Sequence, residues 1–292
     1  MTKALVFGEI LWDIFGEEKT IGGAPFNFAA HLAALGGSVD FCSAVGADAL
    51  GAAARQEIRR AAVSDRFTAE LSLSTGACHV TMAADGSPRY DLLRDVAYDA
   101  IPLPELDEEY DLLYLGTLAR RSPVSRRTAL ALMESGCFRE IFVDINVRRP
   151  DISREVLEES LQRATVVKLS REEAGCLAEF GLLPEMESGE ALAAALTRAY
   201  PNLRLVLLTL DRDGAMLFDA AENSILYSIR PVSPLVSAVG AGDSFSACFA
   251  WNLLNGRSPA EALNRGVLLS DYVVTQLGAI PPIPPELLEK IR

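Results

Sequence analysis

The stretch AVGAGDSFSACFAWNLL (residues 238–254) joins a glycine-rich turn to an apolar run of helical length. Gly240 and Gly242 permit a tight turn, so N–H groups at the start of the helix can point at an anion, which the helix dipole also favours. Asp243 follows directly. It either caps the helix, a frequent role for aspartate, or accepts a proton from a hydroxyl group that attacks a bound phosphate.

Outward from this segment, apolar runs alternate with helix-period segments along most of the chain. This alternation predicts parallel βαβ units. We expect strands at 4–10, 38–46, 110–116, 140–146, 164–170 and 203–210, and helices at 26–35, 48–62 and 122–135. Residues 214–229 predict a hairpin with its turn near Glu222 and Asn223, and from Gly240 onward the chain is expected to be mostly helical.

One segment interrupts the alternation. Residues 76–93, GACHVTMAADGSPRYDLL, read as two alternating strands around Asp85-Gly86, a dipeptide typical of a hairpin turn. We therefore place this hairpin outside the main sheet, as a small β appendage.

Composition limits the classes of function. The 292 residues suit one large domain or one domain with a small appendage, and half of them are hydrophobic. No apolar run reaches the ~20 residues that cross a bilayer. The N-terminus has no signal-peptide layout, so we expect a cytoplasmic protein without a membrane segment. A net charge of −13 argues against nucleic acid as a partner, but backbone N–H groups can still bind small anions.

Cysteine and histidine usage argues against a zinc site. The five cysteines are far apart without a CxxC pair, and there are only two histidines, His31 and His79. We expect a structural role for His31 and a surface position for His79. The P-loop, GxGxxG and GxSxG signatures are also absent, so kinase chemistry would need another anion cradle.

A second glycine pair follows an aspartate near the N-terminus. GEILWD ends in Asp13, and IGGAPFN runs from Ile21 to Asn27. Adjacent glycines permit close approach of backbone to a ligand, and Asp13 and Asn27 offer the acceptors and donors that bind polyols. The alternative is a tight turn with Asn27 as the N-cap of the next helix.

A cluster of arginines, Arg120, Arg121, Arg126 and Arg127, begins near the predicted carboxyl end of a strand. Open α/β sheets bind ligands at that edge. Solvated charge at a helix start is the simpler interpretation, and binding of a phosphorylated substrate is the alternative.

Six segments occur in the order and spacing of a known family: GEILWD, GGAPFN, DINVR, KLSREE, TLDRDG and GAGDSF. From about residue 4 to about residue 285 the chain resembles the ribokinase-like (phosphofructokinase-B, PfkB) carbohydrate kinases, and most closely their bacterial fructokinase branch. The resemblance implies one α/β domain over residues 1–292, with a doubly wound, mainly parallel sheet flanked by helices. It also implies a β lid from strands near 9–22 and 75–95, through which a homodimer would form.

The resemblance further implies roles for individual residues. Asp243 would be the catalytic base. The anion hole would be formed by Gly240, Ala241 and Gly242. Sugar hydroxyls would be held by Asp13, Gly23 and Asn27, with Arg148 near the transferred phosphate or the polar end of the substrate. The nucleotide would lie against Lys168, Ser170, Thr209, Asp211, Gly214 and Val267. Glu173 would act through Mg²⁺ and its waters.

The nucleotide side departs from the family pattern at four positions. Ser170 replaces an asparagine, Asp211 a glycine, Ser237 an aspartate that helps bind a monovalent cation, and Val267 a residue that is often Asn or His. A carboxylate at Asp211 would repel a nearby triphosphate. Without an aspartate at 237 we do not expect strong activation by potassium.

These features predict an ATP-dependent sugar kinase of the fructokinase type, which moves the γ-phosphoryl group of Mg·ATP to a primary hydroxyl. Two alternatives stay open. One is a catalytically impaired sugar-binding or regulatory protein on the same fold. The other is a kinase for another sugar, a sugar acid or a nucleoside. Retention of Asp243, Gly242 and Glu173 favours an active enzyme.

Overall fold

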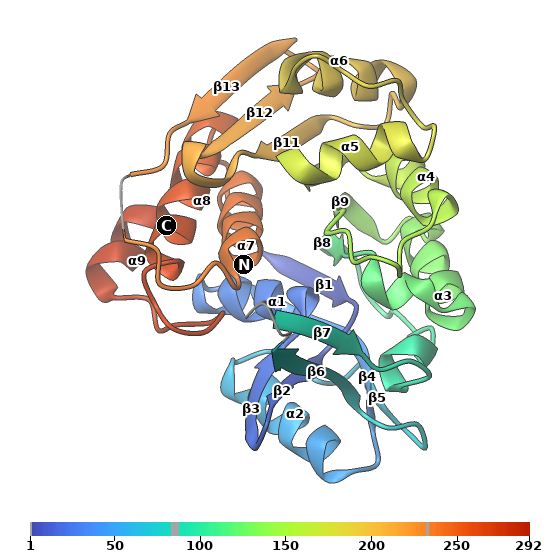
Figure 1. The fold of residues 1–292 in the computed structure, drawn as a ribbon. Helices are drawn as coiled ribbons and strands as arrows, with labels where there is room; N and C mark the ends of the chain where they lie inside the picture. Colours follow the sequence, from blue (N-terminus) through green and yellow to red (C-terminus); the bar gives the residue numbers. More distant parts are fainter. Residues whose placement is uncertain (1, 83–87, 232–233) are drawn as a thin grey trace.

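The computed structural model describes residues 2–82, 88–231 and 234–292 (Figure 1). Its main sheet has the strand order β13-β12-β11-β10-β9-β8-β1-β4-β5. The pairs from β5 to β11 are parallel, and β12 and β13 are added antiparallel at one edge. The strands are β1 (Lys3–Phe7), β4 (Ser38–Gly46), β5 (Thr68–Leu71), β8 (Tyr110–Leu115), β9 (Phe138–Asp144), β10 (Val166–Ser170), β11 (Leu205–Thr209), β12 (Ala215–Asp219) and β13 (Ser224–Ser228).

Helices cover both faces of this sheet (Figure 1). One face packs against α1 (Ala24–Ala34), α2 (Ala49–Arg60), α7 (Ala241–Leu254) and α8 (Pro259–Val273). The other packs against α3 (Pro123–Glu134), α4 (Arg154–Arg163), α5 (Arg171–Glu179) and α6 (Gly189–Ala199). The last helix, α9 (Pro285–Ile291), packs on α8.

Burial on both faces explains why the central strands are apolar runs without alternation. In β11, Val206 and Leu208 belong to the core cluster beneath α3–α6, whereas Leu205 and Leu207 belong to the cluster beneath α1, α7 and α8. A strand covered on both sides is apolar at nearly every position. The predicted α/β class, with a doubly wound and mainly parallel sheet, is confirmed.

A separate four-stranded sheet forms the lid, in the order β3-β2-β6-β7. Its strands are β2 (Leu11–Phe15), β3 (Glu18–Gly22), β6 (Gly76–Met82) and β7 (Pro88–Leu92), which lie within the two ranges expected from the sequence. β2 and β3 are inserted between β1 and α1, and β6 and β7 between β5 and β8, so both insertions leave the main sheet at the carboxyl ends of its strands.

Most predicted elements are confirmed, and the largest boundary error is in the first strand. The strand expected over 4–10 ends at Phe7, where pairing with β4 stops, and the chain enters the lid at Leu11. The hairpin of β12 and β13 turns at Asn223, which has φ 46°, and the C-terminal part is helical as expected. β6 and β7 pair antiparallel as predicted, but the Asp85-Gly86 turn lies outside the described residues.

Over the ranges that the structure describes, no helix has both the length and the apolar character needed to cross a membrane.

Candidate active site

The glycine turn at residues 240–242 forms the start of α7. Gly240 is the N-cap, with φ 79°, and no side chain caps the helix. The cap interpretation of Asp243 is therefore wrong, because Asp243 lies inside the first turn. The N–H groups of a first helical turn have no partners within the helix, so they can bind an anion. That of Ala241 is in a 3.3 Å hydrogen bond to the Ala238 carbonyl oxygen, which an anion would have to replace or share.

Gly240 also lies against the backbone of another loop. A Cβ added there would come within 2.5 Å of the Ala279 carbonyl oxygen, at a φ that L-residues rarely adopt. We expect Gly240→Ala to lower the free energy of unfolding by about 1–3 kcal/mol and to distort the turn. Thermal unfolding and kcat measured on the same preparation check this, and a variant with wild-type values of both would show that the turn adapts.

Asp243 is held by the second glycine segment. Asn27 Nδ2 donates a hydrogen bond of 2.8 Å to Asp243 Oδ2, although the two residues are 216 positions apart. Burial raises the pKa of Asp243, while Asn27, Lys168 and Arg148 oppose that rise. The carboxyl is therefore a stronger base than an exposed aspartate, which suits it to accept a proton from a hydroxyl group.

Asn27 lies inside α1 and does not cap it. The N-cap is Gly23, at φ 109°, where a Cβ would come within 2.5 Å of the Glu9 carbonyl oxygen. The capping alternative for Asn27 is thus wrong. Its amide instead links the sugar-side segment to Asp243, and its Oδ1 is buried without a partner among the described residues.

A buried ion pair lies beneath the anion turn. Lys168 Nζ, at the centre of β10, donates to Asp144 Oδ1 and Oδ2 at 3.0 and 3.2 Å. The same ammonium would be 3.1 Å from a Cβ on Gly242. Burial lowers the pKa of Lys168, but the Asp144 and Glu173 carboxylates outweigh this and raise it. A positive charge therefore lies directly behind the turn.

On the lid side, Asp13 in β2 is half-buried and pairs in register with Cys78 of β6. Burial raises the pKa of Asp13, while the charge of Arg148 and a hydrogen bond from the Cys78 thiol oppose the rise. Arg148 follows β9 and is exposed. The structure thus brings Asp13, Asn27, Arg148 and Asp243 to the carboxyl edge of the sheet, beside the lid.

Ser170 and Glu173 form a capping box at the start of α5. Ser170 Oγ accepts from Glu173 N at 3.1 Å, and Glu173 Oε2 accepts from Ser170 N at 2.7 Å. Glu173 Oε1 accepts from Val147 N at 2.7 Å. Both carboxylate oxygens therefore already have a backbone donor, and each keeps a further lone pair that can accept a hydrogen bond from water.

The other predicted nucleotide residues are spread over two elements. Thr209 ends β11, and Asp211 and Gly214 flank the turn into β12. Asp211 is exposed and takes φ 53°, the left-handed conformation that the family's glycine permits and that Asp tolerates better than most residues. Val267 is only 3 % exposed and packs in the core cluster with Phe245, so its side chain does not reach the surface.

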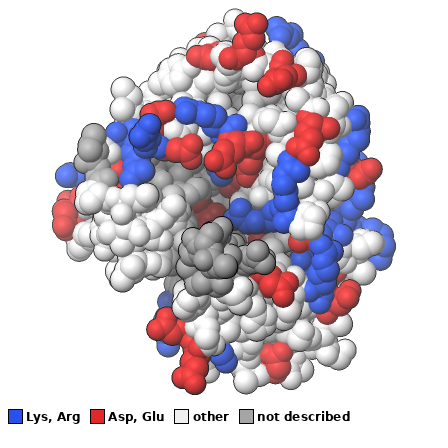
Figure 2. All heavy atoms as spheres, in the orientation of Figure 1, with Lys and Arg blue, Asp and Glu red and all other residues white. Residues whose placement is uncertain are grey.

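Figure 2 shows the face that carries these segments, with a hollow between the lid and the rest of the molecule. Acidic side chains border the hollow, and basic side chains gather along one margin. A separate pocket of about 560 Å³ lies between α5, α6 and the β11–β13 edge. It contains none of the predicted site residues and opens on the α5–α6 face of the sheet.

The predicted structural role of His31 agrees with its position. The ring is buried, and Nε2 lies 2.9 Å from the Ala279 carbonyl oxygen. Burial lowers the pKa of His31 to about 4, so the ring is neutral at physiological pH. His31 therefore fixes the same loop against which Gly240 packs. His79 is exposed on the lid, as expected.

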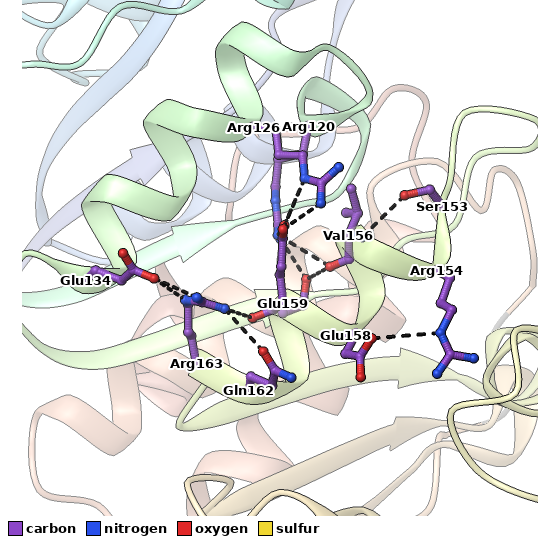
Figure 3. Close-up of polar contacts among 11 residues, drawn as sticks. Arg120, Arg126, Glu134, Ser153, Arg154, Val156, Glu158, Glu159, Gln162 and Arg163 are labelled. Atoms are coloured by element: carbon purple, nitrogen blue, oxygen red, sulfur yellow. Dashed lines mark hydrogen bonds and ion pairs between the residues drawn. The ribbon is translucent and has the colours of Figure 1, made fainter.

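Three of the four clustered arginines, Arg120, Arg121 and Arg126, are structural, so the interpretation as solvated charge is wrong for them, whereas Arg127 is exposed as that interpretation expects. Arg120 is 1 % exposed and donates to Ser160 Oγ, to the Val156 carbonyl and to Glu159. Glu159 also accepts from Arg126, so one carboxylate joins η2 (Leu118–Arg121) and α3 to α4 (Figure 3). Arg121 bridges Asp99 and Asp151. These guanidinium groups are used in packing and are not available to a phosphorylated substrate.

Two site residues were missed from the sequence, Glu9 and Asp144. Both lie inside quoted motifs, GEILWD and DINVR, and both follow or end a strand at the carboxyl edge of the sheet. Their position after a core strand was a usable signal, because ligands bind at that edge.

The doubly wound sheet, its lid and an acid held at a helix N-terminus define a phosphotransferase that acts on a hydroxyl group. Residues 2–286 match the model of the pfkB family carbohydrate kinases, and the chain belongs to this family.

Individual relatives are distant but cover almost the whole chain. The ATP-dependent 6-phosphofructokinase of Thermoanaerobacterium thermosaccharolyticum is 24% identical, over 96% of this chain and 90% of that protein. The fructokinase of Salmonella typhimurium is 26% identical, over 89% and 87%. The structure of a Vibrio cholerae O395 fructokinase with fructose, ADP and calcium superposes with a TM-score of 0.82 at 21% identity, covering 100% of this chain and 99% of that one.

Proposed function

We propose that this carbohydrate kinase is fructokinase-like and transfers the γ-phosphoryl group of ATP to a primary hydroxyl of a free sugar. The observation that carries the proposal is the 2.8 Å hydrogen bond from Asn27 to Asp243 at the start of α7. It joins the polyol-binding segment to the base and to the anion turn. Fructokinases among the relatives, one of them with fructose and ADP bound, support this acceptor.

In this proposal each group has a task in the transfer. Asp13 and Asn27 orient the sugar hydroxyls, and Asp243 accepts the proton of the hydroxyl that attacks phosphorus. The O–P bond to the acceptor forms while the bond from the γ-phosphorus to the leaving oxygen of ADP breaks. First-turn N–H groups of α7 and the Lys168 ammonium behind them stabilise the charge on the transferred group.

The residues present fit a magnesium ion that arrives with the nucleotide. Among residues 2–82, 88–231 and 234–292, no cluster of three or more His, Cys, Asp or Glu side chains forms a metal site. Magnesium keeps several waters and binds phosphates with one or two carboxylates. Glu173, with lone pairs left after its backbone contacts, would hold a water of that ion, whose chemistry is to neutralise phosphate charge.

The direct test is formation of ADP from Mg·ATP across a panel of sugars, sugar acids, sugar phosphates and nucleosides, with fructose included. Sugar-dependent ADP release, highest with fructose, is the expected result. Turnover only with an acidic or phosphorylated acceptor would show that such a compound, and not fructose, is the substrate. Sugar binding without turnover on any acceptor would favour the catalytically impaired alternative.

The exposed carboxylate of Asp211 gives a prediction for the nucleotide. Asp211→Gly removes one negative charge near the predicted phosphate segment and relieves the positive-φ conformation of a non-glycine residue. We expect the KM for ATP to fall roughly threefold to tenfold, with the KM for sugar unchanged. Steady-state kinetics at low salt measure both, and an unchanged KM for ATP would place the carboxylate away from the phosphates.

Ser237 gives a prediction about monovalent cations. Its Oγ accepts from Val239 N at 3.2 Å, and a neutral hydroxyl is a weaker cation ligand than a carboxylate. We expect kcat to change less than twofold when K⁺ is exchanged for Na⁺ or Tris at constant ionic strength. Strong activation by K⁺ alone would mean that backbone carbonyls suffice to bind the ion.

The lid gives a proposal about assembly. Phe15 at the end of β2 is 51% exposed, and the strands β3 and β7 are the edges of the small sheet. An exposed sheet with an apolar residue suits pairing with a second copy, so we propose a lid-to-lid homodimer. Sedimentation of the wild type and of Phe15→Glu tests it. The cytoplasmic location stays a prediction from the sequence.

A further inference from the structure

Glu9 lies between β1 and β2, where the chain leaves the main sheet for the lid. Its side chain is 3 % exposed, and Oε2 has no hydrogen-bond partner among the described residues. Buried polar atoms in native proteins almost always have a partner, and a buried carboxylate oxygen without one is costly. Packing alone therefore does not explain a glutamate at this position.

The groups that face Glu9 come from every element packed around it. Backbone N–H groups of Glu9 itself and of Ala119 donate to its carboxylate. The charged and titratable neighbours are Arg148 after β9, Asp243 in α7, Tyr98 in the 3-10 helix Ala97–Ala100, and Tyr114 in β8. Arg148 is the single cation in this set.

Arg148 is a free cation. Its guanidinium has no ion pair or hydrogen bond to the part of the chain that the structure describes, whereas the adjacent Arg149 pairs with Glu179. Its charge nevertheless acts on the carboxyl groups of Glu9, Asp13 and Asp243. The exposed guanidinium of this arginine can approach any of the three carboxyl groups. To act in the reaction it therefore needs a neighbouring group that fixes its position.

We propose that Glu9 is a positioning residue that acts through Arg148: its carboxylate draws the free guanidinium inward, to where the acceptor meets the transferred phosphoryl group. The inference rests on the proposed function, because it assigns that guanidinium a task in sugar phosphorylation. The proposal adds Glu9 to the site, since Glu9 is not among the residues assigned above to the sugar, the phosphate or the metal.

The pull on Arg148 depends on pH. Burial raises the pKa of Glu9 from 4.5 to about 7, against the opposing effects of its backbone donors and Arg148. Below that pH the carboxyl is neutral and exerts no pull. Above it the carboxyl is ionised and attracts the positive charge of Arg148. kcat/KM for the acceptor is thus expected to rise as pH increases through the neutral range.

A double-mutant cycle at pH 6 and pH 8 tests the proposal, with Glu9→Gln, Arg148→Met and the double variant. At pH 8 we expect Glu9→Gln to lower kcat/KM for the acceptor roughly tenfold, and to have no further effect when Arg148 is already Met. At pH 6 Glu9→Gln is expected to match the wild type. Glu70→Gln, an exposed glutamate on edge strand β5, is the control for loss of a carboxylate.

A merely structural role gives a different result. If the only role of Glu9 is to hold Ala119 through its hydrogen bond, Glu9→Gln lowers kcat/KM by the same factor at both pH values. In the double variant that factor then multiplies with the factor for Arg148→Met. Either observation overturns the proposal.

A second readout needs no turnover. The same proteins are unfolded with urea at pH 6 and 8, without sugar or nucleotide. Attraction between the two charges predicts that Arg148→Met shifts the midpoint more at pH 8 than at pH 6, and that this difference disappears in the Glu9→Gln background. If no acceptor supports ADP formation but this coupling is present, the proposed function fails and the electrostatic interaction between Glu9 and Arg148 stands. Absence of the coupling overturns that interaction even in an active kinase.

Discussion

Asp243→Asn is expected to lower kcat by roughly 10²–10⁴-fold, the usual contribution of a positioned general base. The amide keeps the size of the side chain and can still bond to Asn27, so the glycine turn and the sugar site should persist. The KM or Kd for sugar should therefore change little. Initial rates of ADP formation, with sugar binding measured by calorimetry, separate the two effects.

The Asn27–Asp243 bond supplies a matched control. Asn27→Asp places a second carboxyl within hydrogen-bond distance of Asp243 and raises the pKa of the base further, whereas Asn27→Ala only removes the donor. Loss of activity in Asp243→Asn together with loss of sugar binding would mean that Asp243 holds the sugar or the fold. Wild-type turnover in Asp243→Asn would remove the base mechanism altogether.

Glu9→Gln is expected to stabilise the protein at pH 8 and to leave it unchanged near pH 4. Burial raises the pKa of Glu9 to about 7 in the folded protein, from 4.5 for an unperturbed glutamate. At 1.36 kcal/mol per pKa unit, this difference corresponds to about 3 kcal/mol. Below pH 4.5 the carboxyl is protonated in both states, so the wild type carries no penalty.

As pH rises from 4.5 to 7, the unfolded state releases the proton and the folded state keeps it, so stability falls. Above pH 7 the full penalty is present, and a neutral amide avoids it. Urea unfolding of the two proteins at several pH values between 4 and 8 measures the difference directly. A constant difference across that range would show that Glu9 does not titrate as a buried acid.

This prediction bears on function as well as stability. Glu9 lowers stability at neutral pH because it is a buried acid, and it lies beside the base. Buried titratable residues with shifted pKa values are characteristic of functional sites. The double-mutant cycle then asks what Glu9 does there.

Much of the fold could be predicted from the sequence because the information is local. Apolar runs such as those of β10 and β11 mark strands buried on both faces, and the spacing of glycines marks the turns at Gly23 and Gly240. The six ordered segments placed Asp13, Asn27 and Asp243 in one site without any knowledge of distances. The glycines in these segments allow a positive φ and close approach of backbone. Both properties can be recognised from the residue type alone.

The errors share a physical cause, which is that burial and partners depend on the whole fold. Arg120 and Arg121 look like surface charge in the sequence, but Glu159, Asp99 and Asp151 arrive from distant segments and pair with them. Val267 fits a nucleotide position by alignment, yet the packing of α8 against Phe245 turns it inward. The sequence around these residues determines neither the ion pairs of the arginines nor the burial of Val267.

The class of fold and the two insertions of the small sheet could be predicted from the sequence by itself, because each rests on residue types in fixed local order; the roles of the anion turn and of Asp243 as base stay predictions from the same local pattern. Only the tertiary structure decided that Asn27 bonds to Asp243, that Lys168 and Asp144 lie behind the turn, and that Glu9 is buried within range of the charge of Arg148. Such facts depend on distances between segments far apart in the chain. Those distances are set by how the sheet and helices pack.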